Sequence, residues 1–221
     1  NIAGLLLFGR EAEIEKHLPT HEAAFQVLTA DADVRVNEFF RQPLLELAEL
    51  LLARFDARAQ EQEVQVGLIR VPVPDYARNA FREALLNALF HRDYRRLGTV
   101  YVQWHPDRLE VSSPGGFPEG VTPANILVHE PLPRNPRLYG AVKRIGLVEQ
   151  TGRGVDKVYL GQLRYGRPAP DYSRADATGV RLTLRGGQES LQFAAFVFER
   201  ERQRGPMTVE RSSGQYDFAI T

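Results

Sequence analysis

One helical segment of the sequence carries a narrow polar stripe on an otherwise apolar surface. The periodicity over residues 76–92 predicts a helix, because apolar side chains recur there at helical spacing. Glu83, Asn87 and His91 follow one another at i, i+4 and i+8, so they share one face. The opposite face is apolar and consists of Phe81, Leu85, Ala88 and Leu89. Such a helix buries one side and directs a carboxylate, an amide and an imidazole into a shared space.

The rest of the chain alternates between strand-like and helical segments. Short apolar or β-rich runs predict strands at 5–8, 23–28, 64–73, 99–104, 108–111, near 171 and at 180–184. Helical spacing or cap residues predict helices at 42–59, from Pro123, at 136–145 with Gly146 as its C-cap residue, at 155–162 and at 190–203. Asp75 is a candidate N-cap for the helix at 76–92. We expect a two-layer α/β sandwich, with helices packed on one face of a mixed, mostly antiparallel sheet.

Charge and composition narrow the classes of function. Lys plus Arg and Asp plus Glu number 28 each, so any DNA contact needs a local patch and not a global basic field. The chain has no cysteine, which excludes disulfides, thiol nucleophiles and zinc–thiolate sites and fits a cytoplasmic location. No apolar run approaches the roughly 20 residues of a membrane span, and no signal peptide is recognisable. The first residue, Asn1, suggests that the chain is a piece of a longer protein.

The polar stripe has two interpretations when it is judged from spacing alone. A carboxylate four residues before an amide can position a water and a hard cation, and Mg²⁺ prefers oxygen ligands of this kind. Asn87 would then bind Mg²⁺, and Glu83 would accept a proton from an attacking water. The alternative is a solvated stripe on an amphipathic helix, held by ordinary salt links. Both interpretations stay open at this point.

Five sequence pieces in order resemble a divergent branch of the GHKL (histidine-kinase/gyrase-like) ATPases. The pieces are Arg82–Tyr94, Asp107–Val111, Pro114–Thr122, Arg134–Pro136 and Gly146–Val155. Together they are similar to the signature of RecG-related proteins, which are named as ATP-dependent helicases or transcriptional regulators. The resemblance implies an ATP-binding domain that uses Mg²⁺. A helicase motor is not expected, because the chain has no Gly-x-x-x-x-Gly-Lys-Ser/Thr phosphate loop.

The same resemblance implies a domain organisation. Residues 1–30 are similar to the end of an AlbA-type DNA-binding domain, and residues 31–63 would form a connecting amphipathic helix. Residues 64–189 would be the GHKL-like domain. Residues 190–221 would begin a helical or winged-helix extension.

The resemblance also implies roles for individual residues of the phosphate end. Glu83 would be the general base and Asn87 the ligand of Mg²⁺. Gly152, Arg153 and Gly154 would form a phosphate-cradling turn at a helix N-terminus, with a simple loop-to-helix junction as the alternative.

Three further residues have a binding interpretation and a structural one. Arg134 and Asn135 lie where the lid of the family crosses the site, and Arg134 could meet a terminal phosphate. The alternative for Arg134 is a surface arginine beside a Pro-rich turn. His91 could approach phosphates or make a local bond at its helix end.

The sequence departs from the family in the glycine box that contacts the base. Gly115 and Gly116 match the box, but Ser113 stands where the family has an aspartate for the adenine amino group. A hydroxyl can bond a base but lacks the charge of a carboxylate. The expected function is therefore ATP binding with slow or no hydrolysis in a transcriptional regulator. The alternative is a non-catalytic scaffold or dimerisation module. In both cases DNA would be contacted through neighbouring domains, and a homodimer is a possible assembly.

Overall fold

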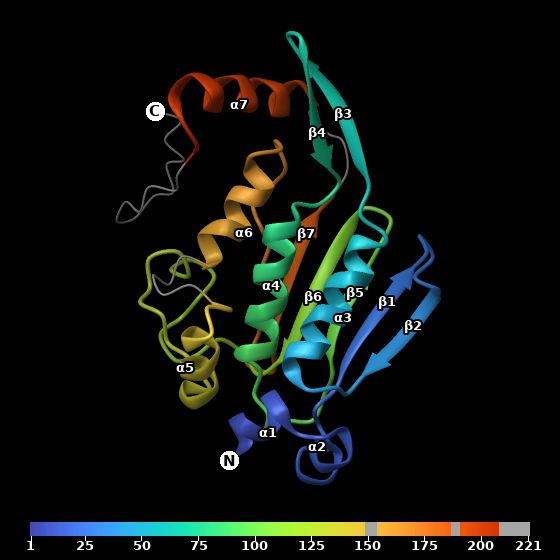
Figure 1. The fold of residues 1–221 in the computed structure, drawn as a ribbon, viewed down its shortest axis with the longest axis vertical. Helices are drawn as coiled ribbons and strands as arrows, with labels where there is room; N and C mark the ends of the chain where they lie inside the picture. The colour runs from blue at the N-terminus through green and yellow to red at the C-terminus, as the bar shows by residue number, and fades with distance from the viewer. Residues whose placement is uncertain (149–153, 187–190, 208–221) are drawn as a thin grey trace.

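A mixed five-stranded sheet forms the framework of the chain (Figure 1). The computed structural model describes residues 1–148, 154–186 and 191–207. The strand order is β2-β1-β5-β6-β7, where the strands are β1 (Ala23–Leu28), β2 (Val34–Phe40), β5 (Val100–Trp104), β6 (Arg108–Pro114) and β7 (Gly179–Arg185). β1 and β5 run parallel, whereas the other neighbouring pairs are antiparallel. The predicted mixed, mostly antiparallel sheet is therefore confirmed.

Three helices pack against one face of this sheet, in front of it in Figure 1. They are α3 (Leu44–Asp56), α4 (Arg78–Phe90) and α6 (Gly154–Leu163). α3 contacts β1, α4 contacts β5 and β6, and α6 lies along α4. The predicted two-layer α/β sandwich is confirmed, as are the predicted helices at 42–59 and 76–92.

Aromatic side chains fill the core between the helices and the sheet. Phe55 of α3 stacks on Phe81 of α4, with ring centroids 4.3 Å apart. Trp104, at the end of β5, contacts Phe55 at 5.6 Å and Tyr76 at 5.1 Å. All four residues are buried, and the strand side chains of this face, such as Val102, are buried with them. This core fixes α4 across the middle of the sheet.

The remaining elements lie around the sandwich. They are α1 (Ile2–Phe8), α2 (Glu11–His17), the hairpin of β3 (Glu61–Val66) and β4 (Ile69–Pro74), α5 (Pro136–Arg144) and α7 (Leu191–Arg204). The hairpin projects beyond the sheet, and α7 packs against it (Figure 1). In the part of the chain that the structure describes, no helix has the length and apolarity to cross a membrane.

The first apolar run of the chain is a helix and not the predicted strand at 5–8. The side chain of Asn1 accepts a hydrogen bond from Gly4 N at 2.9 Å and caps the first turn. Leu6 and Leu7 are buried, as they would also be in a strand. The prediction was wrong because an apolar run of four residues has the same length and composition in a buried strand and in a buried helical turn.

The range 31–63, predicted as a connecting helix, also contains β2 and the start of β3. β2 lies at the edge of the sheet, and Val34 and Phe39 are about half exposed. Its two faces are therefore both partly solvated, so the apolar alternation that identifies a strand is weak. The sheet itself crosses the predicted boundaries at 30 and 63. The AlbA-type assignment of residues 1–30 stays a prediction.

The strand predicted at 64–73 is an antiparallel hairpin of β3 and β4 with a turn between them. Three further local predictions also differ from the structure. Asp75 is not the N-cap of α4, which begins after Ala77; its carboxylate instead accepts from Gln60 N at 3.1 Å and Tyr76 N at 2.9 Å and closes the base of the hairpin. The segment from Pro123 forms turns and not a helix. Asp171 makes a single bridge with Thr183, because its neighbours do not continue the ladder.

Two helices, α4 and α6, approach so closely that a glycine is needed between them. A Cβ placed on Gly161 of α6 would lie 2.6 Å from Ala80 Cβ and 3.0 Å from Ala77 Cβ, both on the α4 side. Real Cβ contacts are not this short, so a larger residue would push the helices apart.

This packing predicts opposite effects for two helical glycines. Gly161→Ala should lower the free energy of unfolding by about 1–3 kcal/mol through overpacking. Gly140→Ala in α5, where a Cβ meets nothing within 4 Å, should raise it by about 0.5–1 kcal/mol through helix propensity. Urea unfolding measures both. Stabilisation by Gly161→Ala would contradict the close packing of α4 and α6.

Candidate functional site

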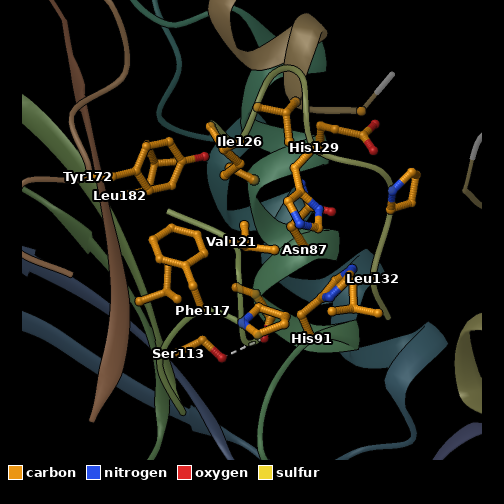
Figure 2. A pocket seen from close by; sticks show the side chains of 18 of the residues that line it. Asn87, His91, Ser113, Phe117, Val121, Ile126, His129, Leu132, Tyr172 and Leu182 are labelled. Carbon is orange, nitrogen blue, oxygen red and sulfur yellow. Dashed lines mark hydrogen bonds between the residues drawn. The ribbon is translucent and has the colours of Figure 1, made fainter. Parts of the chain in front are cut away.

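A cavity of about 180 Å³ opens between α4, the ends of β6 and β7, and the loop that follows β6 (Figure 2). Glu83, Asn87 and His91 all line it, so the structure brings the predicted polar stripe to one cavity. Ala88 lines it as well, although the sequence pattern placed Ala88 on the opposite face. The other walls come from the loop 115–132 and from the start of α6. Figure 2 shows Asn87, His91, His129 and Leu132 across the cavity from Phe117, Tyr172 and Leu182.

Glu83 lies against the first residue of α6. Its side chain is only 4% exposed, and a Cβ on Gly154 would clash with its carboxylate oxygen Oε1. The N-terminus of a helix carries a partial positive charge, which favours an anion in this place. Arg82 Nη1 lies 3.8 Å from Glu83 Oε2, and Arg82 also donates to Leu147 O at 2.8 Å. The carboxylate is thus held between a helix N-terminus and a guanidinium.

The next two residues of the stripe differ in their surroundings. Asn87 is half-buried on the cavity wall and directs its amide into the cavity (Figure 2). His91 follows the last turn of α4 and packs edge-on against Tyr139, with ring centroids 6.0 Å apart. Burial, and then the charge of Arg134, lowers the pKa of His91 to about 4. His91 is therefore neutral at pH 7 and brings no positive charge to a phosphate.

The hydroxyl of Ser113 is engaged within the protein. Ser113 Oγ donates to Ala88 O at 2.7 Å, across the gap between β6 and α4. Ser113 is buried and lines the cavity. The hydroxyl proton of Ser113 is thus donated within the protein, and toward a ligand Ser113 Oγ can only accept a hydrogen bond.

Arg134 and Asn135 build the wall behind the cavity and do not line it. Arg134 donates to Gly116 O, and its Nη1 lies 3.7 Å from Asp93 Oδ2. Asn135 caps the other end of α4 by donating to Phe90 O and Arg92 O, both at 2.9 Å. A contact of either residue with a nucleotide stays a prediction.

The predicted glycine positions divide into three groups. Gly115 and Gly116 line the cavity; Gly115 has a φ of +92°, and a Cβ there would lie 2.6 Å from Asp93 Cβ. Gly154 lines it from the start of α6. Gly152 and Arg153 lie outside the described residues.

Sequence reasoning missed the apolar end of the cavity. Phe117, Val121, Ile126, Tyr172 and Leu182 line this end. Phe117 directly follows the paired glycines, which is a signal that could have been used. Tyr172 and Leu182 come from segments far along the chain from Phe117. The pairing of β6 with β7 brings Leu182 here, and the bridge between Asp171 and Thr183 brings Tyr172.

The charge of the cavity limits what it can bind. Among its described lining residues, Glu83 and Glu130 are acidic, and none is a lysine or an arginine. The described part of the chain also holds no cluster of three or more His, Asp or Glu side chains that could bind a metal by themselves. A cation in this cavity would therefore need ligand atoms from its occupant in addition to the oxygen of Asn87.

The contact between Glu83 and Gly154 predicts that replacing this helical glycine with alanine destabilises the chain. Alanine normally stabilises a helix relative to glycine, but Gly154→Ala should cost about 1–3 kcal/mol of unfolding free energy because its Cβ displaces the Glu83 carboxylate. In a Glu83→Ala background, the same change should cost less. A double-mutant cycle by urea unfolding measures the difference. Equal costs in both backgrounds would show that the two residues do not touch.

The half-buried imidazole of His91 predicts a pH dependence of stability. The pKa of His91 is about 4 in the folded chain against 6.5 for a free side chain, so the unfolded chain binds more protons between these values. The unfolding free energy should therefore fall as the pH falls from 6.5 to 4, by about 3 kcal/mol from this one group. His91→Gln should remove this part of the loss. Parallel stability–pH curves for the two proteins would contradict the burial of His91.

Two comparisons with known proteins found similarities, and one of them names a type of domain. Residues 98–184 match a family model described as "Putative ATP-dependent DNA helicase recG C-terminal". The chain is also similar to the crystal structure of the DIP2311 protein from Corynebacterium diphtheriae, with a TM-score of 0.75 and 30% sequence identity. The similarity covers 87% of this chain but 38% of that protein, so this chain spans well under half the length of its relative. No curated protein matches the chain. These findings support an ATPase-like domain related to the RecG C-terminal family.

Proposed function

We propose that the cavity binds ATP with Mg²⁺, and that hydrolysis there is slow or absent. The observation that carries this proposal is the placement of Glu83 and Asn87 on one face of α4, beside the N-terminus of α6. A helix N-terminus supplies N–H groups and a partial positive charge to phosphate oxygens. The family match supports ATP as the nucleotide. Residues 98–184 begin after α4, so Glu83 and Asn87 rest on geometry and not on that match.

Mg²⁺ fits the residues present only together with phosphates. Asn87 directs an amide oxygen into the cavity, and the described lining has two carboxylates and no lysine or arginine. A bare polyphosphate would be repelled by these carboxylates. When bound, Mg²⁺ would neutralise phosphate charge and orient the phosphates. Binding of ATP should therefore depend strongly on Mg²⁺.

Glu83 is the group that could take up a proton in hydrolysis. A water oxygen would attack the terminal phosphorus, the bond from that phosphorus to the bridging oxygen would break, and ADP would leave with the bonding electrons. Glu83 would accept the proton of the water. Glu83 is 4% exposed and its carboxylate is packed against Gly154, which leaves little space for a water beside it. This crowding favours slow turnover and suits a domain that senses nucleotide.

A sensing role agrees with the proposal that the domain serves a cytoplasmic transcriptional regulator. DNA contact would then come from neighbouring domains, and dimerisation would couple two copies. The competing function is a scaffold that has lost its ligand. The observations that favour it are the engaged hydroxyl of Ser113 and the lack of lysine and arginine in the described lining.

A thermal-shift titration tests the proposal. Mg²⁺-ATP at a hundredfold excess over its dissociation constant should stabilise the chain by about 2.7 kcal/mol. Chelation of Mg²⁺ and Asn87→Ala should each abolish most of the shift, and Glu83→Gln should keep binding while removing any turnover. Asn79→Ala, which changes an exposed asparagine of the same helix, is the matched control.

The outcomes separate the two functions. A shift that Asn87→Ala removes and Asn79→Ala keeps supports nucleotide binding in this cavity. Unfolding temperatures that stay unchanged with ATP, ADP and GTP would instead support the scaffold.

A further inference from the structure

One tyrosine hydroxyl at the apolar end of the cavity has no hydrogen-bond partner among the described residues. Tyr172 is 7% exposed and lines the cavity, and Figure 2 shows its hydroxyl directed into the cavity beside Ile126. Within residues 1–148, 154–186 and 191–207, no hydrogen bond involves this hydroxyl. Burial raises the pKa of the phenol, so the group is a neutral hydroxyl at pH 7.

A buried tyrosine hydroxyl ordinarily finds a hydrogen-bond partner, because its desolvation is otherwise uncompensated. Tyr94 of this chain shows the ordinary case: it is equally buried, and its hydroxyl donates to Leu89 O at 2.9 Å. The difference between the two tyrosines is that the Tyr172 hydroxyl opens into a cavity. Its partner is therefore expected to be the occupant of that cavity.

The aromatic and aliphatic side chains around Tyr172 form a surface on which a flat ring can pack. The rings of Phe117 and Tyr172 are 5.7 Å apart at an angle of 60°, and Val121, Ile126 and Leu182 complete this end. The residues labelled at this end in Figure 2 carry no charge, and Ser113 nearby has already donated its proton to Ala88 O. The hydroxyl of Tyr172 is thus the polar group best placed to orient a ring there.

We propose that Tyr172 is a base-binding residue, whose hydroxyl hydrogen-bonds the base of the bound nucleotide while Phe117 packs against the ring. This assignment rests on the proposed function for the identity of the ligand. It places the base at the Phe117–Tyr172 end and the phosphates at the start of α6. A phenol hydroxyl both donates and accepts, so it can bond the edge of adenine or of guanine. The site should therefore discriminate poorly between ATP and GTP.

Two tyrosine-to-phenylalanine variants test the assignment as a matched pair. Tyr172→Phe should leave the unfolding temperature of the ligand-free chain unchanged, and should weaken Mg²⁺-ATP and Mg²⁺-GTP binding by about threefold to tenfold, as expected for one neutral hydrogen bond. Tyr94→Phe should do the opposite: it should lower the unfolding temperature, because Leu89 O loses its donor, and it should leave both dissociation constants unchanged. Calorimetric titration and thermal unfolding measure these quantities. Adenosine and guanosine, titrated in parallel, report on the base end without phosphates.

Each outcome bears on one of the two proposals. If Tyr172→Phe binds Mg²⁺-ATP as tightly as the unchanged chain does, the base-binding role of Tyr172 is overturned, and the proposal of nucleotide binding stands. A fall in the ligand-free unfolding temperature of Tyr172→Phe like that of Tyr94→Phe would also overturn this role, because the hydroxyl would then be structural. A preference for ATP over GTP of more than about a hundredfold would also overturn it, because a hydroxyl that both donates and accepts can bond either base.

The nucleosides separate the failures. If the nucleosides bind through Tyr172 but the triphosphates bind no more tightly, the base-binding role of Tyr172 stands. The proposal that the start of α6 binds the phosphates is then wrong. If neither nucleosides nor nucleotides bind, both proposals are wrong.

Discussion

The close approach of α4 and α6 determines most of the site. Two glycines of α6 allow it: Gly161 fits against Ala80 in the middle of the contact, and Gly154 fits against Glu83 at its end. Because both helices rest on the same face of the sheet, their separation decides where the N-terminus of α6 meets the polar stripe of α4. A wider separation would leave Glu83 facing a water-filled gap, where the partial charge of a helix end is screened. The packing of small residues is thus also what sets the electrostatics of the cavity.

The charges of the described lining in turn favour a ligand that is uncharged or that is bound together with a cation. Glu83 lies against the N-terminus of α6, and His91 is kept neutral by burial and by the charge of Arg134 behind it. Arg134 itself is turned away from the cavity to Asp93 and Gly116 O. The described lining therefore offers phosphates backbone N–H groups and an amide, but no formal positive charge. A nucleotide bound here, as we propose, would therefore bring its own counter-ion.

The parts of the fold that follow from local periodicity were predictable, and the parts that depend on contacts between segments far apart in the sequence were not. The helical spacing of Glu83, Asn87 and His91 places them in one cavity from the sequence alone, and the alternation in β5 and β6 gives their hairpin. The helix at Leu6 was predicted as a strand because four apolar residues carry no period. No local signal shows that Ser113 bonds Ala88 O, because that bond joins two elements whose distance is set by the core. The same holds for Tyr172, since the bridge between its neighbour Asp171 and Thr183 of β7 brings it to the site.

The loop that closes the cavity is anchored before any ligand arrives. Arg134 ties its end to its beginning by donating to Gly116 O, and Asn125 organises its middle by accepting from Thr122 N at 2.7 Å and donating to Gly120 O at 2.7 Å. A loop fixed in this way loses little conformational entropy on binding, so contacts made by a ligand translate more directly into affinity. The rigid loop also limits adaptation to the ligand. The end of the cavity around Tyr172 then binds a ring through its shape and through one hydroxyl. The size of the space between α4 and β7 limits which rings can bind.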